Sequence, residues 1–403
     1  MKISFLLGSG ISLPAKLPSV TEITDQVLSV DDFVHCADGP YEGFADEKMV
    51  EMKEMGSFLR LLKGLAELRH AADVGRVVNY EDLYYMAAQL RDDLNDEFEN
   101  PALGPLVGLA LNSLPGISAV GAGGIFSLGN RAEQAAAYIA GVVADMLDTK
   151  SDKLEHLRLL SDAIVDPKIG EATLFTLNHD CLLERFLRRE KLEVVDGFEI
   201  ENALGIRRWN PNFYDSQLAH VSTPTVRVFK LHGSVDWRRF RPRGNNNDNP
   251  WSDEYVGIRS NPTLKSAKDE NGREHEEFEP ALFLAGTFNK MAGYLNHVFL
   301  ELHYRFHRTL AESSRLVVCG YGFGDKGINN RITDWMCLSP ESARRKMILI
   351  DPKSLEQIQE MSRGAIGAKL QSWLDAGRFV HLSVGLGSAE LNWEKVSGHL
   401  SEG

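Results

Sequence analysis

Short apolar runs rich in β-branched residues recur along the chain, and each is typical of a buried strand. They are Ile3 to Leu7, Ala172 to Leu177, Val226 to Leu231, Ala281 to Ala285, Leu316 to Cys319, Met347 to Ile350 and Phe379 to Val384. Segments with helical spacing separate most of them, for example Leu182 to Arg189. Strands that alternate with helices predict an α/β protein built on a doubly wound parallel sheet.

The pattern changes between Phe44 and Asp166, where apolar residues recur at helical spacing and strand signals are few. One such stripe comprises Tyr138, Ile139, Val142, Val143, Met146 and Leu147. The Gly-rich stretch from Gly116 to Gly129 is interpreted as a flexible connector, with a ligand cradle as the alternative. These features predict a helical module inserted into the α/β domain.

The same patterns set the expected domain boundaries. We predict a sheet domain over residues 1–43 and 167–390, a helical insertion over 44–166 and a C-terminal tail over 391–403. Within the sheet domain, the stretch 241–279 is strongly polar. It is predicted to be a mobile loop insertion outside the core.

Small and polar residues follow the first three predicted strands, at the point where each strand ends. In an open parallel sheet, ligands bind just outside the carboxyl ends of the strands. The residues concerned are Gly8, Ser9, Gly10, Ser12, Asn178, Asp180, His232, Gly233 and Ser234. Three different polar turns at strand ends predict one assembled site.

The first of these turns contains two glycines, Gly8 and Gly10, which suit positive φ or close backbone approach to a pyrophosphate. Ser19 and Glu22 form the pattern of a capping box, so the turn is expected to lead to a helix N-terminus that favours an anion. Leu13 stands where a dinucleotide-binding fingerprint has its third glycine, which disfavours hydride transfer. A plain tight turn explains the glycines equally well.

The other two turns carry side chains suited to proton and water chemistry. The Asn178 amide can donate to and accept from a hydroxyl or a water, whereas Asp180 suits either a site role or the cap of the following helix. A neutral His232 imidazole could accept a proton, although a lone histidine at a strand end is often structural. The Gly-Ser pair that follows it favours the functional interpretation.

The net charge, the cysteine and histidine spacing and the length of the apolar runs disfavour several classes of partner and site. The net charge of −13 argues against nucleic acid or an anionic membrane as the main partner. The four cysteines, Cys36, Cys181, Cys319 and Cys337, include no C-x-x-C pair, which disfavours a zinc ribbon and fits reduced thiols. His303 and His307 are one helical turn apart, but no third ligand accompanies them, so we predict no metal site. The chain has no secretory signal and no apolar stretch near the roughly 18 residues of a membrane span, so a cytoplasmic location is expected.

Taken together, the motifs resemble those of the sirtuin-like (silent information regulator) NAD-binding family. The matching segments, in order, are Gly8 to Ser12, Thr176 to Asp180, His232-Gly233, and Gly320 to Asp325 with Ile328-Asn329. The last of these looks like the turn of the bacterial branch. The resemblance implies a Rossmann-like fold and NAD as the ligand.

The resemblance also implies a role for each matching residue. Asn178 would sit by the nicotinamide ribose and position the attacking water, with Asp180 in support, and His232 would take the proton. From the residues alone, Gly233 and Ser234 after His232 are expected to open the chain for the ligand. The pyrophosphate would be held by Gly8, Ser9, Gly10 and Ser12, and the adenosine side would be lined by Gly320, Tyr321, Asp325 and Asn329.

Differences from the family pattern favour NAD⁺ hydrolysis over protein deacylation. Protein-deacylating members carry two cysteine pairs and a Gly-Ile-Pro-Asp-Phe-Arg stretch, where this chain has Leu13-Pro14-Ala15-Lys16-Leu17-Pro18. His179 stands where the family has an aromatic residue. These differences fit the bacterial branch that hydrolyses NAD⁺ in defence against phage. The resemblance therefore implies an NAD⁺ glycohydrolase that needs no metal, self-assembles, and acts as a subunit beside a HerA-type ATPase.

Three alternatives stay open at this point. The first is a non-catalytic module that binds NAD or ADP-ribose, and the second is an NAD-dependent protein deacylase. The third is a nuclease, for which the sequence offers no paired-carboxylate metal motif.

Overall fold

The computed structural model describes most of the chain, in segments separated by short gaps. The described residues are 1–30, 45–70, 77–94, 100–114, 127–216, 224–243, 254–264, 267–278, 280–286, 288–338 and 342–401. They form two compact units. The sheet unit comprises Met1–Leu17, Leu147–Phe283 and Tyr294–Gly403, and the helical unit comprises Pro18–Met146 and Leu284–Gly293.

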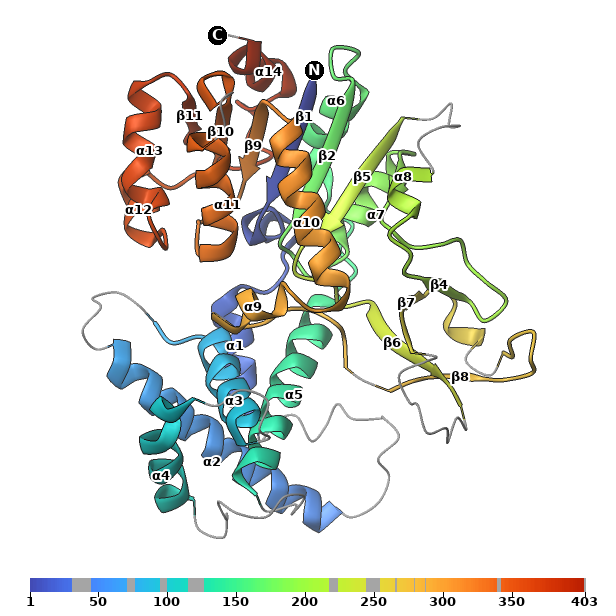
Figure 1. Cartoon of the computed structure of the whole chain (residues 1–403), viewed down its shortest axis with the longest axis vertical. Coiled ribbons are helices and arrows are strands. Elements are labelled where there is room, and N and C mark those ends of the chain that lie inside the picture. Colours follow the sequence, from blue (N-terminus) through green and yellow to red (C-terminus); the bar gives the residue numbers. More distant parts are fainter. Residues whose placement is uncertain are drawn as a thin grey trace. The chain divides into compact units, whose positions relative to one another are not determined.

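The sheet unit is built on seven parallel strands in the order β11-β10-β9-β1-β2-β5-β3 (Figure 1). These strands are β1 (Lys2–Leu7), β2 (Glu171–Thr176), β3 (Glu193–Val195), β5 (Thr225–Lys230), β9 (Arg315–Cys319), β10 (Lys346–Ile350) and β11 (Phe379–Leu382). The chain begins in the middle, builds one side with β2, β5 and β3, and then crosses β1 to build the other. The doubly wound, Rossmann-like sheet predicted from the sequence is confirmed.

Helices cover both faces of this sheet. The core on one face joins Phe5 and Leu7 of β1 to α6 (Arg158–Val165), α7 (Leu182–Arg189) and α14 (Trp393–Ser401). On the other face lies α10 (His297–Glu312) (Figure 1). Its Phe306 ring contacts the Phe175 ring of β2, with centroids 4.8 Å apart. The remaining helices of the unit are α8 (Phe213–Ser216), α11 (Lys326–Cys337), α12 (Leu355–Met361) and α13 (Ile366–Asp375).

The predicted C-terminal tail belongs to this core. Trp393 of α14 is buried and its ring lies 6.2 Å from that of Phe5, and Val396 and Leu400 are fully buried on the same helix. The sequence interpretation missed the helix because the segment is short and its apolar residues are few.

A second, antiparallel sheet includes parts of the stretch 241–279, which was predicted to be a polar loop. Its strand order is β4-β7-β6-β8. The strands are β4 (Ile206–Arg208), β6 (Trp237–Pro242), β7 (Tyr255–Arg259) and β8 (His275–Glu277). The loop prediction is wrong for β7, β8 and the end of β6, where polar side chains form ion pairs between strands: Arg241 contacts Glu276 at 2.8 Å and Arg259 contacts Glu277 at 2.7 Å.

The segment Ala281 to Ala285, predicted as a strand, makes a single bridge instead. Phe283 pairs with Gly233 in antiparallel fashion. The short apolar run is explained by burial of Phe283 and Ala285, because a buried loop and a strand give the same pattern over so few residues.

The helical unit contains α1 (Val20–Leu28), α2 (Ala45–His70), α3 (Tyr80–Leu94), α4 (Gly104–Ser113), α5 (Leu128–Leu147) and α9 (Phe288–Gly293). Ser19 and Glu22 form the predicted capping box at the start of α1. The unit begins at Pro18 and ends its main stretch at Met146, whereas the sequence-based division placed these boundaries at 44 and 166. Most of the Gly-rich stretch from Gly116 to Gly129 lies outside the described residues.

Over the described part of the chain, no helix combines the length and apolar character that crossing a membrane requires.

Candidate functional site

Four neighbouring strands end at the same level of the parallel sheet. Leu7 of β1 pairs with Thr176 of β2 and with Cys319 of β9, and Thr176 in turn pairs with Lys230 of β5. The loops that follow these residues therefore start side by side at the carboxyl edge. They contain every site residue predicted from the sequence except Asn329, which lies in the first turns of α11. This edge also includes the junction of β1 and β9, where the strand order reverses and ligands of such folds bind.

The glycines of the β1 and β9 loops allow the two backbones to touch. Gly8 N–H donates to the Cys319 carbonyl at 3.0 Å, and Gly10 N–H donates to the Gly320 carbonyl at 2.9 Å. A Cβ added to Gly10 would lie 2.7 Å from the Gly320 Cα, and Gly320 itself has φ +60°. Close packing between loops thus accounts for Gly8, Gly10 and Gly320, and the Gly10 amide is already engaged within the protein.

The helix that follows the glycine turn starts at the predicted capping box. Two short 3₁₀ turns, Ser9–Ile11 and Leu13–Ala15, come first, and α1 begins only at Val20. Its first turn carries Glu22, whose carboxylate accepts from Ser19 N–H at 2.7 Å. The α1 N-terminus therefore holds an anionic side chain, and the anion cradle expected from the sequence stays a prediction.

A buried hydrogen-bond chain joins the β1 loop to the β2 loop. Asn178 Nδ2 donates to Ser12 Oγ at 2.9 Å, and Ser12 Oγ donates to Asp180 Oδ2 at 2.7 Å. All three residues are at most 7% exposed. Asp180 Oδ1 accepts from Leu182 N–H at 3.0 Å, at the first residue of α7, whose N-cap position is Cys181.

In the hydrogen-bond chain of Asn178, Ser12 and Asp180, the carboxamide oxygen of Asn178 is the unsatisfied atom. Its orientation follows from the network, because the amide nitrogen is the atom that can donate to Ser12. Asn178 Oδ1 is buried and has no hydrogen-bond partner within the described structure. An unpaired buried acceptor costs about 1–3 kcal/mol. A ligand hydroxyl or a water at this position would remove that cost.

His232, after β5, lies in a second polar cluster. Its Nε2 is 3.2 Å from Asp325 Oδ2 and 3.2 Å from the Tyr294 hydroxyl. The Tyr294 hydroxyl donates to Asp325 Oδ2 at 2.6 Å. The ring of His179, next to Asn178, lies 6.3 Å from the His232 ring, which brings the β2 and β5 loops together. No sequence motif marks Tyr294, so the sequence alone does not indicate its place in this cluster.

His303 supports this cluster from α10. Its ring stacks on Tyr294 with centroids 3.6 Å apart, and its Nε2 contacts the Leu231 carbonyl at 3.1 Å. Burial, and then the charge of His232, lower the pKa of His303 to about 3. His303 is therefore neutral near pH 7 and donates Nε2–H to that carbonyl. His307, its partner in the metal motif that we considered, is exposed, and within the described residues no group of three or more His, Cys, Asp or Glu side chains could hold a metal.

The other predicted ligand residues have internal partners. The Tyr321 hydroxyl donates to Asn329 Oδ1 at 2.8 Å, and Asn329 Nδ2 donates to the Phe323 carbonyl at 2.7 Å. Gly233 adopts φ +78° against the backbone of residues 282–283, and Ser234 Oγ donates to the His179 carbonyl at 3.2 Å. These side chains shape the loops at the carboxyl edge, whereas Ser9 is exposed there.

A buried ion pair lies beneath the β2 and β5 loops. Lys230 Nζ is 3.0 Å from Glu184 Oε1, with side chains 5% and 9% exposed, and it also donates to the Asp180 carbonyl. Burial lowers the pKa of Lys230, but the Glu184 carboxylate and other acidic groups more than offset this, so the pKa is raised and the lysine is charged. A cavity of about 20 Å³ adjoins the pair and is lined in part by Cys181 and Trp237. The pair ties the segment that carries Asp180 to the strand that leads to His232.

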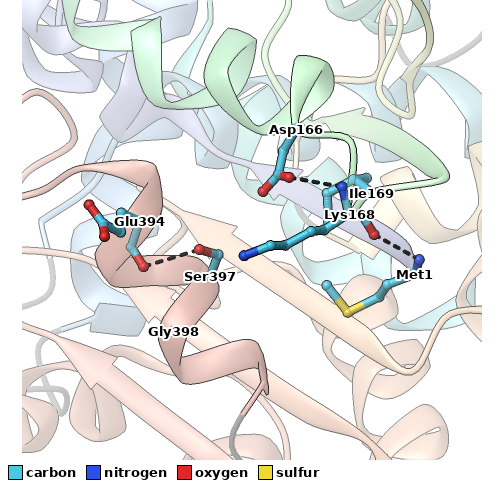
Figure 2. Close-up of a pocket in the computed structure, with 7 residues that line it drawn as sticks. All are labelled: Met1, Asp166, Lys168, Ile169, Glu394, Ser397 and Gly398. Atoms are coloured by element: carbon cyan, nitrogen blue, oxygen red, sulfur yellow. Dashed lines mark hydrogen bonds between the residues drawn. The ribbon is translucent and has the colours of Figure 1, made fainter.

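Another pocket of the sheet unit lies away from these loops. It has a volume of about 190 Å³ and is lined by Met1, Asp166, Lys168, Ile169, Glu394, Ser397 and Gly398 (Figure 2). Met1 precedes β1 and Ile169 precedes β2, so the pocket lies at the amino ends of the strands. Figure 2 shows the Lys168 side chain extending toward Ser397 of α14. The pocket is thus at the opposite edge from Asn178 and His232.

Comparison with known proteins gives one family match. Residues 172–366 match the model of a SIR2-like domain. The search of curated proteins gives no significant match. The match includes the segments of the site after β2, β5 and β9.

Several solved structures are similar over most of the chain. The structure of a SIR2 homolog–NAD complex is 13% identical, with a TM-score of 0.36, and the alignment covers 99% of this chain and 89% of that one. That of Sir2Tm bound to a propionylated peptide is 11% identical, with a TM-score of 0.34, over 100% and 94% of the two chains. That of Sir2 bound to acetylated peptide is 12% identical, with a TM-score of 0.34, over 99% and 94%. Residues 172–366, which contain Asn178, Asp180 and His232, are thus similar to a SIR2-like domain.

Proposed function

We propose that this protein is an NAD⁺ glycohydrolase, which cleaves NAD⁺ to nicotinamide and ADP-ribose. The observation that carries the proposal is the buried, unpaired Oδ1 of Asn178 at the carboxyl edge of the sheet. This atom is held in place by Ser12 and Asp180 and has no donor within the described structure. The SIR2-like domain match supports NAD⁺ as the ligand that supplies a hydrogen-bond donor to this oxygen.

The reaction makes few demands on the protein. Water adds to the ribose carbon, the bond from that carbon to nicotinamide breaks, and one proton is released. Nicotinamide leaves as a neutral molecule from a cationic ring, so no general acid is needed. What the site must supply is position and electrostatic stabilisation of positive charge on the ribose.

The described residues divide these tasks. Asn178 Oδ1 accepts from the attacking water or a ribose hydroxyl and holds it in place. His232, on the next strand end, accepts the proton, because a neutral imidazole is a base of suitable strength near pH 7. Asp180 supports Asn178 through Ser12 and places negative charge near the developing cation.

The biological setting belongs to the same proposal and rests on the sequence resemblance. NAD⁺ depletion would serve antiviral defence, with the protein as a self-assembling subunit beside an ATPase of the HerA type. The chain has no phosphate-binding G-x-x-x-x-G-K-[ST] motif of its own. A separate ATPase subunit would supply that activity.

The test is nicotinamide release from NAD⁺, with the protein alone and with its partner ATPase. Asn178→Ala and His232→Ala should each abolish release. Matched controls are Asn330→Ala and His307→Ala, which change exposed residues of α11 and α10. Full activity in both site variants would refute the proposal.

The alternatives have distinct outcomes in the same assay. Saturable NAD⁺ binding without nicotinamide release, under every partner condition, would identify a binding module. Release of nicotinamide only together with an acyl group from a lysine peptide would identify a deacylase. DNA cleavage that survives both substitutions would indicate a nuclease site elsewhere.

A further inference from the structure

The imidazole of His232 faces two oxygen atoms through the same nitrogen. Nε2 lies 3.2 Å from Asp325 Oδ2 and 3.2 Å from the Tyr294 hydroxyl. The His232 side chain is only 4% exposed and that of Asp325 12%. The three groups therefore form a compact, largely buried cluster.

The direction of the hydrogen bonds in this cluster can be worked out. Asp325 Oδ2 is 2.6 Å from the Tyr294 oxygen, and a carboxylate only accepts, so the Tyr294 hydrogen points to Asp325. Toward His232, the Tyr294 oxygen then offers a lone pair. Both oxygens near Nε2 are acceptors, so Nε2 must carry the hydrogen. In the neutral ring, Nδ1 is then the basic nitrogen.

The carboxylate that imposes this arrangement is itself anchored. Asp325 is the N-cap of α11, and its Oδ1 accepts from Gly327 N–H at 2.8 Å and from Ile328 N–H at 3.1 Å. Each oxygen thus has a separate task, one toward the helix and one toward His232. Because the cap fixes the carboxylate plane, Oδ2 cannot turn away without breaking it.

We infer that Asp325, together with Tyr294, is a positioning residue that holds His232 in the Nε2–H form and leaves Nδ1 as the base of the proposed reaction. The inference rests on the proposed function. It gives Asp325 a role on the nicotinamide side, different from the adenosine side expected from the family resemblance. When Nδ1 accepts the proton of the attacking water, the Asp325 carboxylate faces the resulting imidazolium and stabilises it.

Asp325→Asn is the variant that isolates this role. An asparagine oxygen can still accept from Gly327 and Ile328, so the cap is kept and the amide NH₂ is forced to the Oδ2 position. That group donates, so it favours an unprotonated Nε2 and moves the hydrogen to Nδ1. Tyr294→Phe is the matched second variant, because it removes the hydroxyl but leaves the carboxylate acceptor and the stack on His303.

The experiment measures both the protonated nitrogen and the rate. Protein with ¹⁵N-labelled histidine is examined by NMR at mildly alkaline pH, where ¹⁵N shifts distinguish protonated from bare ring nitrogens, and a His232→Gln spectrum identifies the signal. We expect Nε2–H in the wild type and in Tyr294→Phe, and Nδ1–H in Asp325→Asn. For NAD⁺ cleavage, kcat of Asp325→Asn should fall by about 100-fold or more, with KM nearly unchanged.

The NMR signal and the kcat together distinguish a failure of this inference from a failure of the proposed function. An Nδ1–H signal in the wild type, or an Asp325→Asn variant that switches the nitrogen yet keeps its kcat, would overturn the inference even if the wild type cleaves NAD⁺. A wild type that never cleaves NAD⁺, but whose signal switches in Asp325→Asn, would support the pairing and refute the glycohydrolase.

Discussion

Replacing Lys230 with methionine should destabilise the sheet unit strongly, because it removes the cation from a buried ion pair. Methionine keeps the length and apolar character of the stem, so the change is mainly one of charge. At 3.0 Å and an effective dielectric constant of about 20, the attraction between Lys230 and Glu184 is roughly 5 kcal/mol. Removing one member of such a pair typically costs about 3–5 kcal/mol, since it leaves the other charge buried and unpaired. The Asp180 carbonyl also loses its donor.

The assay is denaturant unfolding followed by tryptophan fluorescence. Trp237 lines the cavity beside the pair and is 2% exposed, so its signal reports on this region. At about 2 °C per kcal/mol, the expected loss corresponds to a melting temperature lower by roughly 6–10 °C. Glu184→Gln and the double variant Lys230→Met/Glu184→Gln complete a double-mutant cycle.

The cycle distinguishes an ion pair from two independent packing effects. In the Lys230→Met/Glu184→Gln protein, no charge of the pair is left buried, so the loss should be smaller than the sum of the two single losses by about 1–3 kcal/mol. A Lys230→Met protein that unfolds at the wild-type denaturant concentration, or losses that simply add, would refute the reasoning.

Two further predictions concern the loops around the site. Gly10→Ala should lower the unfolding free energy by about 1–3 kcal/mol, because its Cβ would lie 2.7 Å from the Gly320 Cα. Gly322→Ala is the control and should be neutral, because the space around its Cβ is open. Equal effects of the two substitutions in a melting assay would contradict the loop packing. His303 has a pKa of about 3 when folded and about 6.5 when unfolded, so the unfolded state binds the proton first as the pH falls, and stability should drop between these values by up to about 1.4 kcal/mol per pH unit. His303→Gln keeps a donor for the Leu231 carbonyl and should flatten this part of the stability–pH curve; parallel curves for the two proteins would contradict the assignment.

The sequence predicted the sheet and the edge where the site lies, because both depend on local patterns. Apolar runs marked the strands, and the polar residues after them marked the carboxyl ends. The α7 bounds and the Ser19–Glu22 capping box follow equally local rules. All of these features depend on residues that are close together in the sequence.

What the sequence could not supply are the pairings across long distances. Ser12 and Asn178 are 166 positions apart, and nothing local indicates that the serine faces the amide and Asp180 rather than a phosphate. Tyr294 approaches His232 from a segment without a motif. The antiparallel sheet was hidden because its arginines and glutamates pair across strands, and such alternation has the composition of a loop.

The central claim is tested most directly by one comparison, between wild type and Asn178→Ala, of the nicotinamide and ADP-ribose formed from NAD⁺ under conditions where the wild type turns over. We predict that the wild type forms the two products in equal amounts and that Asn178→Ala forms neither, while its melting temperature falls only modestly, because the substitution removes one buried hydrogen bond, to Ser12 Oγ, together with an acceptor that is already unpaired. An Asn178→Ala protein that still cleaves NAD⁺ at the wild-type rate would contradict the account.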